Sequence, residues 1–208
     1  MTDEDQQMVY IIDDDPSICD GITNLLEAVG IQSRRYLSAE QFRSLLVNPL
    51  AGCILLDARL PGISGPEFQD QMRRSGCEMP IIFMTAHGDM AMVRKVLKAG
   101  AIDFLIKPFR KEELLRAIEQ AFALEAERRK ERASLKAIQT RVDSLTEREK
   151  QVMSLVTAGL LNKQIAAELE ISEIMVKVHR RRVMDGMQAA SLADLVKMCE
   201  RVRFPSRA

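Results

Sequence analysis

The sequence predicts two domains of different fold class: a doubly wound, five-stranded parallel α/β domain, followed by an all-α domain of about four helices. Three observations carry this prediction. Over residues 1–124, apolar runs of strand length alternate with amphipathic segments of helical period. The runs are almost continuously apolar, as expected of strands that are covered by helices on both faces. From residue 144 onward, only the helical period remains.

The elements of the first domain follow in order along the chain. Strands are predicted at residues 8–13, 31–36, 52–57, 80–85 and 101–106. Helices are predicted to begin near Pro16, Ser38, Ser64, Asp89 and Arg110. Ser38 and Gln41 have the spacing of a capping box, and the turn residues from Pro61 to Gly65 supply a tight loop after Asp57. Strands and helices that alternate in this way form a parallel sheet.

Residues 125–143 predict a charged helix that links domain 1–124 to domain 144–208, because they contain no glycine or proline and are rich in Glu, Arg and Ala. Apolar residues recur at spacings of three and four from Leu135 to Leu145. This pattern is similar to a coiled-coil seam but is shorter than the three or four heptads that define one. Dimerisation through this segment and a rigid extension of the preceding helix both remain open.

Capping signals place the helices of the second domain. Thr146 and Glu149 form a capping box, with Leu145 as its hydrophobic staple. Gly159 is predicted to end the first helix, while Ser172 and Ser191 can cap two later ones.

Composition limits the function. At 208 residues, with 47% hydrophobic and 29% charged residues, the chain has room for one large or two modest domains. Residues 1–124 hold 13 Lys and Arg against 18 Asp and Glu, whereas residues 125–208 hold 17 against 12, which favours an anion-binding second domain. The four scattered cysteines indicate reduced thiols rather than a disulfide framework. No apolar run approaches the ~20 residues of a membrane span, so a cytoplasmic protein without a membrane partner is expected.

Acidic side chains end two of the predicted strands. Asp13 ends the first strand and is followed by Asp14, and Asp57 ends the third. The carboxyl ends of parallel strands share one edge of a sheet, so these carboxylates should meet there, together with Thr85 and Lys107 at later strand ends. Clustered carboxylates without His or Cys suit Mg²⁺. A hydroxyl and an ammonium beside them complete a site for phosphoryl chemistry.

This order of residues resembles the receiver domain of two-component response regulators, which has a flavodoxin-like fold. The resemblance implies that Asp57 accepts a phosphoryl group. It also implies that Thr85 and Phe104 form a switch, and that Lys107 supplies positive charge before a cis peptide at Pro108. The implied Mg²⁺ ligands are Asp13, Asp14, Asp57 and the backbone carbonyl of Arg59.

The second domain resembles the helix-turn-helix of LuxR-type regulators. The resemblance lies in three segments, at residues 145–149, 159–166 and 171–180. Joined to a receiver, it is similar to the NarL/FixJ class of response regulators, in the style of its FixJ and styrene- or toluene-sensing members. Helical spacing separates an apolar stripe of Val176, Val183 and Met187 from a basic face suited to the DNA major groove. The implied DNA contacts are Lys163, Lys177, Val178, His179, Arg180 and Arg181.

The expected function is therefore control of transcription by a response regulator that is phosphorylated on Asp57 by a sensor histidine kinase. The protein is not expected to be an enzyme beyond its own phosphoryl transfer and autodephosphorylation. The other expected partners are promoter DNA, RNA polymerase and a second copy of the chain when phosphorylated. A phosphoaspartyl phosphatase is the alternative from another class, but no substrate-covering cap is apparent in the sequence.

Several residues depart from the family pattern. Met175 stands where relatives usually carry Thr, and Gly186 stands where they usually carry Lys. Both changes remove polar groups that could contact phosphate, so weaker DNA binding or a protein-binding adaptor is a further alternative. Arg94 and Lys95 lie on the receiver face that relatives use for dimerisation, where small apolar or acidic residues are more common.

Overall fold

The computed structural model describes residues 7–43, 51–86 and 100–205. The chain divides into two compact units, Met1–Arg128 and Arg129–Ala208, and each is described by itself. The predicted helix near Asp89 lies outside the described residues, as do Arg94 and Lys95.

A five-stranded parallel sheet forms the centre of the first unit, which confirms the predicted fold class. The strand order is β2-β1-β3-β6-β7. Three strands, β2, β6 and β7, begin one or two residues later than predicted, because their pairing with the neighbouring strands begins there. The bounds are β1 (Met8–Ile12), β2 (Gln32–Tyr36), β3 (Gly52–Asp57), β6 (Ile81–Thr85) and β7 (Asp103–Ile106).

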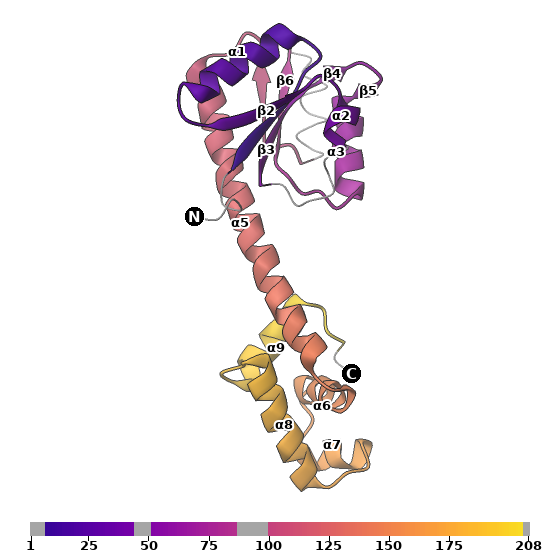
Figure 1. Cartoon of the computed structure of the whole chain (residues 1–208). Coiled ribbons are helices and arrows are strands. Elements are labelled where there is room, and N and C mark those ends of the chain that lie inside the picture. The colour runs from indigo at the N-terminus through magenta and orange to yellow at the C-terminus, as the bar shows by residue number, and fades with distance from the viewer. Residues whose placement is uncertain (1–6, 44–50, 87–99, 206–208) are drawn as a thin grey trace. The chain divides into compact units, whose positions relative to one another are not determined.

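Helices cover both faces of this sheet (Figure 1). Helix α1 (Pro16–Glu27) and the first part of α5 (Lys111–Ser144) pack on one face, against Val9 and Ile11. Helices α2 (Ala39–Arg43) and α3 (Gly65–Arg74) pack on the other face, against Tyr10 and Ile12. Alternate residues of β1 therefore enter two separate cores, as the continuous apolar pattern of the strand requires.

Two glycines allow close approaches, one at the amino-terminal edge of the sheet and one near its carboxyl-terminal edge. Gly52, at φ +139°, begins β3, and a Cβ atom there would lie only 1.8 Å from the carbonyl oxygen of Met8. Gly65 begins α3 beside Phe83, whose ring would lie 2.6 Å from an added Cβ atom. Between Asp57 and Gly65, β4 (Arg59–Leu60) and β5 (Ile63–Ser64) form a short antiparallel pair. The loop after Asp57 is therefore closely held.

The second unit is helical throughout its described elements and consists of the end of α5 and four further helices. These are α6 (Glu147–Thr157), α7 (Asn162–Glu168), α8 (Glu173–Met187) and α9 (Leu192–Arg201). The seam residues Ile138, Val142 and Leu145 are buried in the core of this unit, together with Val176 and Val183. The apolar spacing at the end of α5 therefore serves the core of the unit itself, and residues 125–143 are helical.

The caps agree with prediction at the second unit and differ at one helix of the first. Thr146 and Glu149 form both halves of a capping box, and Ser172 and Ser191 cap α8 and α9. Ser38 accepts the expected hydrogen bond from the Gln41 amide at 3.3 Å. The Gln41 side chain, however, accepts from the amide of Leu37 instead of Ser38. The hydrogen bond from the backbone to the Gln41 side chain, which is the second bond of the predicted capping box, therefore comes from the residue before Ser38.

Candidate functional site

Three charged side chains meet at the carboxyl-terminal edge of the sheet. Asp13 directly follows β1, Asp57 ends the neighbouring strand β3, and Lys107 follows β7 at the end of the sheet. The Lys107 ammonium Nζ lies 2.5 Å from Asp13 Oδ2 and 3.4 Å from Asp57 Oδ2. A single cation from a distant part of the sequence therefore bridges two carboxylates.

The oxygen ligands beside this cation suit a hard divalent ion. Oxygens of Asp13, Asp14 and Asp57 all lie within 4.8 Å of one another. Asp13 is buried, with 1% of its surface exposed, whereas Asp14 is exposed and Asp57 is half-buried. The donor set consists of carboxylates alone, which fits Mg²⁺ and not zinc. The structure thus brings together three of the predicted ligands, from two strand ends.

The surroundings of Asp57 act against its ionised form. Burial raises the pKa of Asp57, the nearby Lys107 charge partly offsets that rise, and the Asp13 carboxylate adds to it. The backbone amide of Arg59 donates to Asp57 Oδ1 at 3.3 Å, which holds the carboxylate toward the β4 turn. An additional positive charge near Asp57 would therefore be stabilising.

The remaining predicted residues of this edge surround the carboxylates. Thr85 is buried at the end of β6, and its carbonyl accepts from the Lys107 amide at 2.7 Å. Phe104 is half-buried on β7 and packs against the core that contains Phe83. The Lys107–Pro108 peptide is cis, as the sequence predicted. The strand ends thus gather the predicted residues of the first unit.

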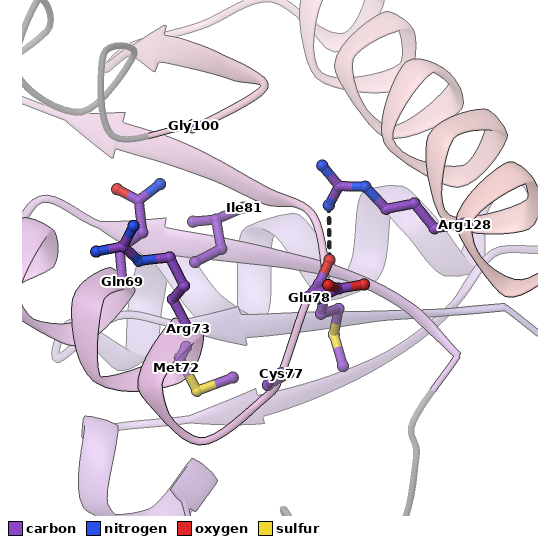
Figure 2. A pocket seen from close by; sticks show the side chains of 9 residues that line it. Gln69, Met72, Arg73, Cys77, Glu78, Ile81, Gly100 and Arg128 are labelled. Carbon is purple, nitrogen blue, oxygen red and sulfur yellow. Dashed lines mark hydrogen bonds between the residues drawn. The ribbon is translucent and has the colours of Figure 1, made fainter. Parts of the chain in front are cut away.

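A cavity of the first unit lies elsewhere (Figure 2). Its volume is about 320 Å³, and Ile81 and Gly100 place it beside the amino-terminal ends of β6 and β7, opposite the carboxylates. Both arginines that line it are engaged, because Arg128 donates to the Glu78 carbonyl at 2.7 Å and Arg73 pairs with Asp70 at 2.8 Å. The carboxylates and Lys107 therefore lie outside this cavity.

Helix α8 of the second unit presents a basic surface opposite its buried stripe. Val176, Val183 and Met187 are buried, which confirms the predicted core face. Lys177 and Arg181 are exposed on the other side of the helix. Such a helix, with charged groups on the face that points away from its own core, can bind nucleic acid in the major groove.

The other predicted contacts of this unit have different surroundings. Lys163 is exposed near the start of α7, as a phosphate contact requires. His179 is half-buried, and its Nδ1 atom is enclosed without a hydrogen-bond partner. Arg180 donates to Asn162 Oδ1 at 2.8 Å, so its guanidinium takes part in the packing of α7 against α8. No sequence pattern indicated this internal role.

One exposed residue of α8 was not identified from the sequence. Ile174 has 73% of its surface exposed and lies one turn before Val178. The signal that could have found it was the helical spacing of Ile174, Val178 and Arg181, which places all three on one stripe.

Two family models match the chain, one for each unit. The response regulator receiver domain matches residues 9–119. The luxR family of bacterial regulatory proteins matches residues 143–199. Neither match includes residues 120–142, which lie within α5.

Similar proteins extend over almost the whole chain. The response regulator protein TodT of Pseudomonas putida is 41% identical over 196 residues, which cover 94% of this chain and 86% of TodT. The transcriptional regulatory protein FixJ of Bradyrhizobium diazoefficiens is 39% identical over 193 residues, which cover 93% of this chain and 94% of FixJ. The solved structure of the response regulator StyR is 44% identical, with a TM-score of 0.80, and covers 94% of this chain and 99% of StyR.

No helix among the described residues is both long and apolar enough to cross a lipid bilayer. The sheet with its acidic edge, the helical unit with its basic helix and the two family matches agree with one another. The chain belongs to the response regulators of the NarL/FixJ type, in which a receiver domain is joined to a LuxR-type DNA-binding domain.

Proposed function

We propose that Asp57 accepts a phosphoryl group from a sensor histidine kinase and that this modification controls promoter binding by the helical unit. The main support for this proposal is the position of Lys107 Nζ, which lies 2.5 Å from Asp13 Oδ2 and 3.4 Å from Asp57 Oδ2. This ammonium supplies positive charge where a phosphoryl group on Asp57 would bring negative charge. The same arrangement would serve slow hydrolysis of the phosphoaspartate by the protein itself.

The chemistry uses the carboxylates in separate roles. A carboxylate oxygen of Asp57 attacks the phosphorus of a phosphohistidine, a new P–O bond forms, and the P–N bond to the histidine breaks. Asp13, Asp14, Asp57 and the carbonyl of Arg59 would hold Mg²⁺, which neutralises charge on the phosphoryl oxygens when it is bound. Lys107 would contribute the remaining positive charge, since its ammonium lies beside both Asp13 and Asp57.

Thr85 and Phe104 form the proposed switch. Thr85 stands at the carboxyl end of β6, next to β7, which carries Phe104. Its hydroxyl would donate to a phosphoryl oxygen on Asp57, and Phe104 would turn into the space that Thr85 leaves. Lys107, which follows β7, and Pro108 would hold the end of that strand in place. This role would be supported if the Thr85→Ala variant of the full chain is phosphorylated normally but its affinity for DNA no longer changes on phosphorylation.

The helical unit provides the proposed output. Lys163 and His179 would contact phosphates, while Lys177, Val178 and Arg181 would face base edges. Arg180 would have its main role in positioning α8, since it bonds to Asn162. We propose residues 1–124 as the receiver, 125–143 as a helical link and 144–208 as the DNA-binding domain. A phosphorylated homodimer would bind paired half-sites and act on RNA polymerase in the cytoplasm.

The direct test is phosphoryl transfer to the purified full chain. The protein is incubated with Mg²⁺ and a small acyl phosphate, and its intact mass is recorded beside those of Asp57→Ala and Asp70→Asn. We expect wild type and Asp70→Asn to gain one phosphoryl group and Asp57→Ala to gain none. Equal gain by Asp57→Ala would overturn the assignment of the acceptor. A promoter-fragment gel shift at rising salt then tests the output, because binding through phosphate contacts weakens steeply with salt.

A further inference from the structure

The exposed face of α8 is divided into an apolar part and a basic part. Ile174 is 73% exposed and Val178 is 37% exposed, and they lie one helical turn apart. Met175 is also exposed beside them. Lys177 and Arg181 are exposed on the adjoining part of the same face. The amino-terminal turns of the helix thus carry large apolar side chains toward solvent.

Helix geometry places Ile174 in the middle of this face. At about 100° per residue, Ile174 lies about 40° from Val178 and about 20° from Arg181 around the helix axis. The buried residues Val176 and Val183 lie on the opposite side. Ile174 is the second residue of α8, and the amino-terminal residues of a recognition helix are those that approach base edges.

We propose that Ile174 is a specificity-determining residue that, with Val178, contacts the 5-methyl groups of thymines in the major groove. This inference rests on the proposed DNA-binding function and extends it to the class of half-site. Neither side chain can form a hydrogen bond to a base, and the thymine methyl is the apolar group that the major groove offers. Lys177 and Arg181 lie beside them and suit guanine edges. The preferred half-site therefore combines thymine with an adjacent guanine.

The residue types and the charge of this surface favour DNA over a protein partner. A face in which large apolar side chains adjoin exposed cations matches a groove that offers methyl groups between rows of phosphates. The contact removes an exposed isoleucine from water, and guanine edges offer hydrogen-bond acceptors to Lys177 and Arg181. The occupant inferred for this face is thus double-stranded DNA.

The test replaces thymine by deoxyuridine, which lacks only the methyl group. The full chain, treated with Mg²⁺ and a small acyl phosphate, first selects binding sites from a randomised duplex pool. Each thymine of the selected half-site is then replaced singly. We expect one or two positions at which the loss of a methyl group weakens binding by wild type about fourfold. Ile174→Ala should bind the unmodified thymine site more weakly than wild type does. At one of these positions, replacing thymine by deoxyuridine should not weaken the binding of this variant any further.

Two controls separate this contact from other roles. Leu192→Ala removes an exposed apolar side chain from α9 and should keep the wild-type response to deoxyuridine. Ile174→Ala should keep the wild-type slope of log affinity against log salt concentration. Lys163→Ala, which removes a proposed phosphate contact, should reduce the size of that slope by about one.

The outcomes are distinguishable. If Ile174→Ala selects the same half-site and keeps every deoxyuridine effect, Ile174 is not a specificity residue and the inference is overturned, although the DNA-binding function stands. If the wild-type chain enriches no sequence, the proposed function itself fails, and the inference falls with it.

Discussion

Arg180 donates to Asn162 Oδ1 at 2.8 Å, and this hydrogen bond joins the recognition helix α8 to the first residue of α7. The bond is partly buried, so it is shielded from competing water. It fixes the two helices of the helix-turn-helix relative to each other. We therefore propose that Arg180 supports DNA binding through the shape of the motif.

Removing either partner should destabilise the second unit. We expect Arg180→Ala and Asn162→Ala each to lower its free energy of unfolding by about 1 kcal/mol. The double variant should lose little more than either single variant, because both remove the same bond. Hydrogen exchange of α7 and α8 amides in the full chain measures the loss. Arg182→Ala, at an exposed position beside them, is the matched control; an equal loss there would contradict the positioning role.

Leu161 leaves α7 without a side-chain cap. It occupies the N-cap position, is 70% exposed and has no oxygen to accept from the first turn. Its amide donates to Gln164 Oε1 at 2.8 Å, so only the return half of a capping box exists. We expect Leu161→Ser to stabilise α7 by about 1 kcal/mol, as measured by slower exchange of its amides. Leu161→Ala adds no oxygen and should give no such gain; an equal effect of the two variants would argue against capping.

Gly186 packs against Leu145, which explains the missing side chain. A Cβ atom at Gly186 would lie 2.8 Å from Leu145 Cδ2, a terminal atom that would have to shift. Gly186→Ala should therefore realise less than the ~1 kcal/mol that alanine gains over glycine in an open helix. In a Leu145→Ala background, we expect the full gain. Calorimetry of the four proteins measures this coupling, and additive effects would contradict it.

The fold could be predicted from the sequence because periodicity and capping are local signals. The apolar runs before Asp13 and Asp57 identified the strands, and their parallel order then required the two carboxylates to meet. The presence of Lys107 beside them was also predicted, since it stands at a strand end of the same sheet, but its bridge between Asp13 and Asp57 was not. These predictions needed only the position of each residue along its element.

Other features depend on contacts between elements and were not visible in the pattern. The seam that ends in Leu145 has the same spacing whether it pairs with a second chain or enters the core of its own unit. The sequence pattern predicted Arg180 only as a DNA contact, because nothing in the pattern places Asn162 beside it. Gly186 was noted for the charge that it lacks, but its packing against Leu145 was not foreseen. Each required the packing of two helices to be known.

Asp57 should make the stability of the receiver depend on pH in a defined direction. Burial, aided by the Asp13 charge, raises its pKa above the ordinary value near 3.8, despite the opposing charge of Lys107. Between that value and the raised one, the folded state binds more protons than the unfolded state. The contribution of Asp57 to the free energy of unfolding therefore falls as pH rises through this window.

Asp57→Asn removes this unfavourable ionisation. We expect the variant to have a higher melting temperature than wild type at about pH 7 without Mg²⁺, and the difference to shrink as the pH falls and the wild-type carboxyl becomes protonated. Added Mg²⁺ should also reduce the difference, because it compensates the charge of ionised Asp57 and so stabilises the wild type. Asp70→Asn is the control of opposite sign, because a hydrogen bond from Arg73 lowers the pKa of Asp70. A wild-type receiver that is more stable than Asp57→Asn at neutral pH would mean that Lys107 outweighs burial.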